Sequence, residues 1–226
     1  MNKKNDIKEE IIKDLKKGKF DWQNCSWAVA KYCPDKFDKE KYNWQNHSME
    51  VAKYCPEKLD SERYNWEDYS WAVAKYCPDK FDKEKYNWQN HSYAVAKYCP
   101  DKFDKEKYNW QNHSMEVAEY CPEKLDKEKY NWKYCSWAVA EYCPEKLDEE
   151  KYNWRQDGQY ILNNKTVLKR IKKYNKKTYN NILKKIKILK KETENGKRNT
   201  KRNRFTKTRR LYRAFDTIRN KGKKRN

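Results

Sequence analysis

The chain has 226 residues, of which 39% are charged, and its net charge is +21 at pH 7. Four glycines and three histidines leave no phosphate-binding loop and no set of nucleophile, base and orienting group, so we expect no catalytic residues and no cofactor. The sequence contains no apolar leader and no run of 18 apolar residues, which predicts an intracellular, cytoplasmic protein without membrane contact.

Residues 1–19 are predicted to form an N-terminal capping helix. Apolar side chains recur at helical spacing between Asp6 and Leu15, at Ile7, Ile11 and Ile12. A stack of repeats needs a cap with one polar face, so we expect this amphipathic helix to cover the first repeat. A helix that binds a partner is the alternative.

Residues 20–154 contain six copies of a 22-residue unit and the start of a seventh at Tyr152. The unit is Tyr-Asn-Trp-x-x-x-Ser-x-x-Val-Ala-x-Tyr-Cys-Pro-x-Lys-Phe/Leu-Asp followed by a charged stretch. A fixed period of this length predicts a solenoid, because each unit is too small to bury its apolar face alone. The expected fold is all-α: an α-solenoid of six to seven two-helix repeats, followed by a long basic helix and a basic, partly disordered tail.

Two short helices are predicted in each unit. A serine before the apolar run is expected to be the N-cap of a helix of about seven residues that the proline ends. An aspartate is expected to cap a second helix that runs through the Lys-Glu-Lys segment. The serines are Ser26, Ser48, Ser70, Ser92, Ser114 and Ser136, and the aspartates are Asp38, Asp60, Asp82, Asp104, Asp126 and Asp148.

Residues 22 apart occupy equivalent places, so the core is expected to consist of ladders along the solenoid. The tryptophans are expected to form one ladder. The valines, each with the alanine that follows it, are expected to form a second ladder, and the phenylalanine or leucine of each repeat is expected to cover the second ladder. An exposed platform on which bases stack is the alternative for the tryptophans. The tryptophans are Trp22, Trp44, Trp66, Trp88, Trp110, Trp132 and Trp154.

The cysteines are predicted to be buried thiols. Each Cys-Pro cysteine occurs once per unit, so stacking would separate neighbours by about 8–10 Å, which is too far for a disulfide or a zinc site. Cys25 and Cys135 share a column with His47, His91 and His113, but these histidines lack close partners in sequence. We therefore expect no metal.

Positions on either side of the serine differ between copies, and they are the candidate protein-binding surface. Core positions repeat in a solenoid, whereas exposed binding positions are free to vary, and large aromatic residues and methionine suit an interface. Neutral drift after duplication explains the variation equally well. The candidates are Trp27, Met49, Tyr69, Trp71, Tyr93, Met115, Tyr134 and Trp137.

Positive charge is concentrated in the last third of the chain. The six repeats carry a net charge of −5, whereas residues 152–226 contain 27 basic and four acidic residues. Within this third, residues 155–192 are predicted to be a basic helical region, with one long amphipathic helix or a broken pair from about Asn164. Residues 193–226 are predicted to be a flexible basic linker and an arginine-rich tail.

A segment of this charge density binds polyanions through phosphate contacts and counterion release, so nucleic acid is the expected partner, RNA slightly ahead of DNA. Anionic lipid ranks low because the helix predicted over residues 164–192 has its apolar residues at core-like spacing and lacks tryptophan, and docking on the acidic repeats stays open. The candidate contacts are Lys169, Arg170, Lys172, Lys173, Lys176, Lys177, Lys184, Lys185, Lys187, Arg198, Lys201, Arg202, Arg204, Arg209, Arg210, Tyr212, Arg213, Phe215 and Arg219.

The Val-Ala-x-Tyr-Cys-Pro-Glu-Lys-Leu stretch, followed by aspartate, resembles the short two-helix repeats of leucine-rich-repeat-variant type found in viral and bacterial proteins. The resemblance covers residues 20 to about 154, and Tyr-Cys stands where leucines are usual. It implies an α-solenoid and transfers no catalytic residue. The sequence thus predicts a non-catalytic adaptor with a nucleic-acid-binding extension. The alternative is a protein-binding scaffold or inhibitor, viral or from a phage, whose basic tail contacts an acidic protein surface or a nucleoprotein complex.

Overall fold

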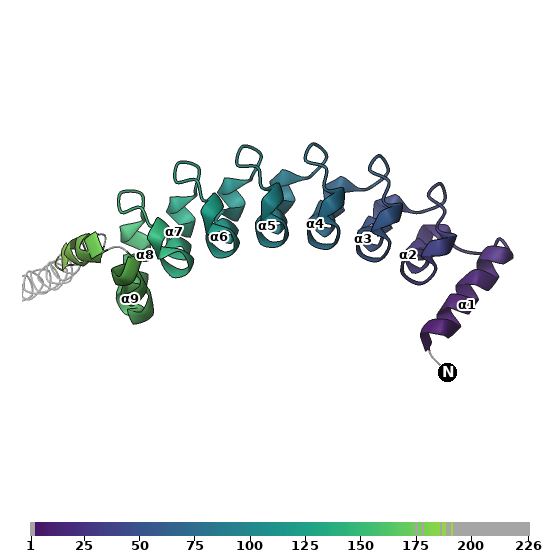
Figure 1. Cartoon of the computed structure of the whole chain (residues 1–226), viewed down its shortest axis with the longest axis horizontal. Helices are drawn as coiled ribbons and strands as arrows, with labels where there is room; N and C mark the ends of the chain where they lie inside the picture. Colours follow the sequence, from purple (N-terminus) through teal and green to yellow (C-terminus); the bar gives the residue numbers. More distant parts are fainter. Residues whose placement is uncertain (1–2, 175, 178, 186, 189–190, 192–226) are drawn as a thin grey trace, which may run out of the picture. The chain divides into compact units, whose positions relative to one another are not determined.

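The structure is a computed structural model that describes residues 3–174, 176–177, 179–185, 187–188 and 191, and every element in these ranges is helical (Figure 1). Contacts divide the chain into two compact units, residues 1–146 and 147–226. Every helix in the described ranges is too short or too polar to cross a membrane. The elements are α1 (Lys3–Lys16), α2 (Trp22–Tyr32), η1 (Pro34–Lys36), α3 (Trp44–Tyr54), η2 (Pro56–Lys58), α4 (Trp66–Tyr76), η3 (Pro78–Lys80), α5 (Trp88–Tyr98), η4 (Pro100–Lys102), α6 (Trp110–Tyr120), η5 (Pro122–Lys124), α7 (Trp132–Tyr142), η6 (Pro144–Lys146), α8 (Trp154–Asn163) and α9 (Lys165–Tyr174).

In the first unit, α2 to α7 stand side by side in chain order, and the turns between them lie along one edge (Figure 1). Each repeat contributes an eleven-residue α-helix, a three-residue 3-10 helix and a turn. The proline after each cysteine starts the 3-10 helix, because its fixed φ suits a first helical position. The predicted tandem array of sequentially packed helices is confirmed.

The prediction that serine caps the repeat helix is wrong. The helices begin five residues earlier than predicted, and their N-cap is Asp21 or an asparagine such as Asn43, whose side chain accepts a hydrogen bond from the N–H of Asn46 at 3.1 Å. Serine lies in mid-helix and is fully buried. The Ser48 hydroxyl donates to the Trp44 carbonyl at 2.5 Å and accepts from the Asn65 N–H of the next repeat at 3.0 Å. Serine therefore joins consecutive repeats.

The second helix of each repeat is also misplaced by the sequence prediction. It is the 3-10 helix at the proline, and the segment after Asp38 is a turn. The Asp38 carboxylate accepts from the N–H of Glu40, two residues on, at 3.1 Å, which is the geometry of an Asx turn. The Tyr42 N–H donates to the Asp38 carbonyl at 3.0 Å and closes the turn.

The core consists of ladders, as predicted. Trp44 and its equivalents up to Trp132 are buried, while Trp22 and Trp154 at the two ends are half-buried. Each buried indole donates to a carbonyl five residues earlier, as from Trp44 to Lys39 at 2.9 Å. The repeat valines and the alanines after them are fully buried, whereas the phenylalanine or leucine column is half-buried up to Leu125.

A tyrosine column that the sequence analysis did not assign to the core is buried as well. Tyr42 is only 4% exposed to solvent, and its hydroxyl donates to the His47 carbonyl at 2.8 Å. Its ring contacts Trp44 with centroids 5.1 Å apart. Burial raises the pKa of Tyr42, so the phenol stays protonated and satisfied by the carbonyl. The Tyr-Asn-Trp triplet that recurs every 22 residues from Tyr42 onward was the available signal.

Helix α1 covers the first repeat, as expected from its apolar spacing. Ile11 is buried in a cluster with Ala28, Val29 and Cys33, and Ile7, Ile12 and Leu15 pack against it. Gly18 has a φ of +64°, a left-handed conformation that glycine adopts at low cost, and it ends the α1 segment before Phe20.

The second unit contains α8, α9 and further helical residues in the described ranges up to 191. Ile161, Val167, Ile171 and Ile182 are its fully buried side chains. α9 begins where the predicted amphipathic segment starts, directly after Asn164, whose side chain accepts from the N–H groups of the first α9 turn. The expected basic linker and arginine-rich tail of residues 193–226 lie outside the described residues.

Candidate functional site

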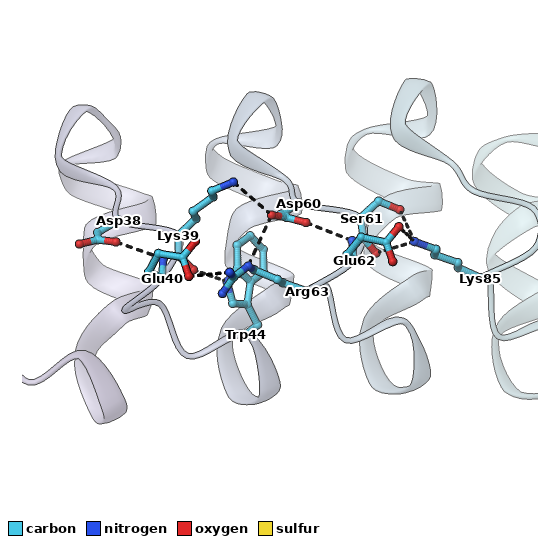
Figure 2. A network of polar contacts seen from close by, with 9 residues as sticks. All are labelled: Asp38, Lys39, Glu40, Trp44, Asp60, Ser61, Glu62, Arg63 and Lys85. Atoms are coloured by element: carbon cyan, nitrogen blue, oxygen red, sulfur yellow. Dashed lines mark hydrogen bonds and ion pairs between the residues drawn. The ribbon is translucent and has the colours of Figure 1, made fainter.

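The turn edge of the repeats, formed by the turns after α2 to α6, carries cations that are paired with carboxylates (Figure 2). Arg63 reaches back to Glu40 of the preceding repeat at 2.5 Å, and Lys39 reaches forward to Asp60 at 3.8 Å. Lys85 pairs with Glu62 at 2.5 Å. The same pairing recurs between Lys107 and Glu84 and between Lys129 and Glu106. These cations link repeats.

A second set of lysines lies at the C-terminal end of the repeat helices, each between two tyrosine rings. Lys53 Nζ is 4.9 Å from the Tyr54 ring and 5.6 Å from the Tyr76 ring of the next repeat. We call this row the tyrosine–lysine ladder. It consists of Lys31, Lys53, Lys75 and Lys97 with Tyr32, Tyr54, Tyr76, Tyr98 and Tyr120.

The ladder is at the surface, and its lysines differ from those of the turn edge. Tyr54 and Tyr98 are each 37% exposed, and in the part of the chain that the structure describes no ladder lysine lies within ion-pair distance of a carboxylate. The hydrogen bond to the Tyr54 side chain raises the pKa of Lys53. The charge changes sign farther along, where Glu119 and Glu141 replace the lysine.

The predicted protein-binding residues lie beside this ladder or close to it. Trp27 is exposed and its ring is 6.3 Å from that of Tyr32; Trp71 and Trp137 contact the tyrosines five residues later in the same way. Tyr93 contacts His113 with centroids 5.6 Å apart. Tyr134 is 53% exposed, and Met49, Tyr69 and Met115 are half-buried. The Tyr69 hydroxyl donates to the Asn46 carbonyl at 3.1 Å.

Two repeats carry glutamate where the others have a buried alanine, a difference that the sequence analysis did not use. Glu50 follows Met49, and burial raises the pKa of its carboxyl. Glu116 follows Met115, and one of its carboxylate oxygens is buried without a hydrogen-bond partner in the described structure. α3 and α6, which carry them, depart from helical φ/ψ at His47 and His113. The larger side chain and the local distortion occur together.

The predicted nucleic-acid contacts divide into three groups. Lys169, Lys172, Lys173, Lys176, Lys177, Lys184 and Lys187 are exposed, and Arg170 and Lys185 are half-buried. Lys185 donates to the Glu149 carbonyl at 2.7 Å and lies 5.2 Å from the Trp154 ring, so it packs within the second unit. The residues from Arg198 to Arg219, including Tyr212 and Phe215, lie outside the described residues.

The cysteines of the Cys-Pro pairs are buried, while Cys25 is exposed and Cys135 is half-buried. Burial raises the pKa of Cys55, Cys77, Cys99 and Cys121 to about 12, which keeps these thiols protonated near neutral pH. Within the described ranges, no group of three histidine, cysteine or carboxylate side chains is placed to hold a metal ion. His91 instead bonds with the Ser70 hydroxyl of the preceding repeat at 2.9 Å.

Repeated helices that pack in sequence, with ladders for a core, define an all-helical tandem-repeat protein of solenoid-like architecture. No family model matches the sequence, no curated protein matches it, and no solved structure matches its fold.

Proposed function

We propose that the protein is a non-catalytic adaptor, in which the repeats bind a protein and the basic C-terminal region binds nucleic acid. The division of charge along the sequence carries this proposal. Residues 152–226 have a net charge of +23, and the repeats have a net charge of −5. A concentration of cations in one region supports binding to a phosphate backbone, which releases condensed counterions and needs little geometric fit.

The orientation of α9 supports the same proposal. Val167 and Ile171 are buried, whereas Lys169, Lys172 and Lys173 on the other face are exposed. An amphipathic helix that packs through its apolar side presents a row of ammonium groups to solvent. The arginine-rich tail adds guanidinium groups and the rings of Tyr212 and Phe215, which suit unpaired RNA bases, so RNA ranks slightly ahead of DNA.

The alternative is a protein-binding scaffold or inhibitor whose basic tail contacts an acidic protein surface. The aromatic residues beside the tyrosine–lysine ladder favour it, because aromatic side chains and methionine are enriched at protein interfaces. Both forms of the proposal include three further points. The repeats are related to leucine-rich-repeat-variant arrays, the protein is of viral or phage origin, and it is located in the cytoplasm.

Binding of fluorescein-labelled single-stranded RNA, single-stranded DNA and duplex DNA, followed by anisotropy across a salt series, tests the proposal. The logarithm of the affinity should fall linearly with the logarithm of salt concentration, by about 0.7 per single-strand phosphate contact. Removal of residues 193–226 should weaken binding and flatten the slope. Replacement of the exposed lysines at 169, 172, 173, 176 and 177 with glutamine should do the same.

A matched control replaces five exposed lysines of the repeats, at 36, 41, 58, 80 and 105, with glutamine. The control changes the net charge equally and should leave most of the affinity in place. Absence of binding to all three nucleic acids would contradict the proposal and favour the scaffold alternative. Equal losses in the two lysine variants would show that net charge alone, and not the C-terminal region, sets the affinity.

A further inference from the structure

The repeats hold two chemically different sets of lysines. Lysines of the turn edge face carboxylates, as Lys85 faces Glu62 at 2.5 Å, and their charge is neutralised within the array (Figure 2). Lysines of the tyrosine–lysine ladder contact only aromatic rings at short range. A cation–π contact orients the ammonium group without neutralising its charge, and the nearby Glu50 and Glu119 lie beyond ion-pair distance of the ladder lysines. The ladder is therefore a row of cations open to an anionic ligand.

The same contacts restrict how a ligand can bind. Tyr54 has Lys31 at 5.5 Å and Lys53 at 4.9 Å from its ring, and Tyr76 has Lys53 and Lys75 placed in the same way. Ammonium groups thus occupy the rings on which a base would stack. What remains available is the donor set of ammonium N–H and phenol O–H groups, which suits carboxylates and peptide carbonyls.

We propose that the tyrosine–lysine ladder is the docking surface for an extended acidic segment of a protein partner, with one acidic side chain per repeat over α2 to α5. The inference rests on the proposed role of the repeats as a protein-binding surface and names the chemistry of the partner. An extended chain fits better than a helix, because its carbonyls are unpaired and can accept from the ladder as well.

The spacing of the ladder matches such a segment. Because Lys53 Nζ lies 4.9 Å from one ring and 5.6 Å from the next, the two rings are at most about 10.5 Å apart, an upper limit that includes the usual packing distance of neighbouring helices, about 8–10 Å. A polyproline II chain advances about 9 Å per turn of three residues. Acidic residues at every third position of that chain therefore meet successive lysines of the ladder.

The charge reversal at the far end favours a peptide over nucleic acid. Glu119 and Glu141 stand where the earlier repeats have lysine, and a uniformly negative phosphate backbone would be repelled there. A peptide can change sign along its length. The partner segment is acidic where it lies over the first four repeats. At α6 and α7 it is either basic or has already ended. Trp27 and Trp71 flank the ladder and add apolar contacts for neighbouring side chains.

Lysine-acylation footprinting by mass spectrometry tests the inference on the full chain, because it reports each lysine separately. The probe is a synthetic peptide of four Glu-Pro-Pro units followed by two lysines, and the control peptide has glutamine in place of glutamate. The glutamate peptide should slow acylation of Lys53, Lys75 and Lys97 at least about threefold. Acylation of Lys41 and Lys105 on the turn edge should not change.

A pair of variants separates charge from packing. Lys53→Gln with Lys75→Gln should lower the peptide affinity at the ladder, read from Lys97 protection, by about fivefold. Lys53→Arg with Lys75→Arg keeps the charge and the ring contacts and should retain the affinity. Glu119→Lys extends the cationic row and should raise the affinity for a six-unit acidic peptide about threefold.

Three outcomes would overturn the inference: unprotected ladder lysines, equal protection by the glutamine peptide, or protection of the ladder by an oligouridine probe and not by the acidic peptide. The oligouridine arm also reads Lys169 and Lys172 in α9. If it protects neither α9 nor the tail while the peptide protects the ladder, the nucleic-acid proposal fails and the docking inference stands. The reverse pattern removes the docking inference alone.

Discussion

At the scale of single residues, the asparagine of Tyr-Asn-Trp makes hydrogen bonds in two directions. In the fourth repeat, Asn87 accepts from the N–H of Asn90 at 3.0 Å, which caps α5, and its amide donates to the Glu67 carbonyl of the preceding repeat at 2.9 Å. The N-cap bond satisfies one of the N–H groups that a helix leaves unpaired at its start. One side chain thus begins a helix and joins it to its neighbour.

Asn87→Ala removes both bonds, and we expect it to lower the free energy of unfolding by about 2 kcal/mol, half from the cap and half from the bond between repeats. Asn131 is the matched control. Its amide donates to the Gln111 carbonyl at 2.7 Å, but its side chain makes no cap bond to α7. Asn131→Ala should therefore cost about 1 kcal/mol. Urea unfolding measures both, and equal losses would show that the cap contributes nothing.

At the scale of elements, the core ladders and the ion pairs of the turn edge both join adjacent repeats, and their magnitudes differ. Val95 in α5 is fully buried, so replacing it with alanine removes about two buried methylene equivalents and leaves a cavity. Glu84 and Lys107 pair at 2.5 Å, but the Glu84 side chain is 79% exposed. An exposed pair contributes at most about 1 kcal/mol.

We therefore expect Val95→Ala to lower the free energy of unfolding by about 2 kcal/mol, and Glu84→Gln to lower it by less than about 1 kcal/mol. A double-mutant cycle with Lys107→Gln isolates the pair, and its coupling energy should vanish in 1 M salt. A coupling energy that exceeds the loss from Val95→Ala would mean that the ion pairs, and not the ladders, hold the array together.

The order and period of the elements could be predicted from the sequence, because a 22-residue repeat forces equivalent residues into ladders. The positions at which the helices begin and end within each repeat were harder to predict. Ser48 and Asn43 are both good N-cap residues, and only tertiary contacts decide that asparagine caps while serine is buried. Asp38 likewise suits a cap or an Asx turn, and the turn prevails in so short a segment.

The tyrosine–lysine ladder could not be predicted from one repeat. Lys53 and Tyr54 are adjacent in sequence, but the contact that makes the ladder continuous is between Lys53 and Tyr76, 23 residues apart. Its existence depends on the offset between neighbouring helices, which sequence periodicity does not specify. The variable aromatic positions were predicted, and the structure adds that Trp27 and Trp71 lie against the tyrosines of the ladder.

At the scale of the whole repeat array, each helix contacts its neighbours in sequence, so stability is local, and α1 covers the N-terminal end of the array. Ile11 of α1 packs on Val29 and Cys33, and the Cys33 thiol lies 3.9 Å from the Lys8 carbonyl. Burial raises the pKa of Cys33, which keeps it protonated and unreactive near neutral pH. Its reactivity therefore reports whether α1 is docked.

Ile11→Ala deletes buried methylene groups and should weaken the docking of α1 by about 2 kcal/mol. We expect labelling of Cys33 by a thiol reagent at pH 8 to accelerate at least about tenfold, because a difference of about 1.4 kcal/mol is one factor of ten in the open population. Cys99, three repeats away, should react as slowly as before, since a solenoid transmits a disturbance only through nearest neighbours.

Lys13→Ala, at an exposed position of α1, is the control and should change neither rate. If Cys33 and Cys99 accelerate together in Ile11→Ala, the array opens as one cooperative unit and α1 is more than a local cap.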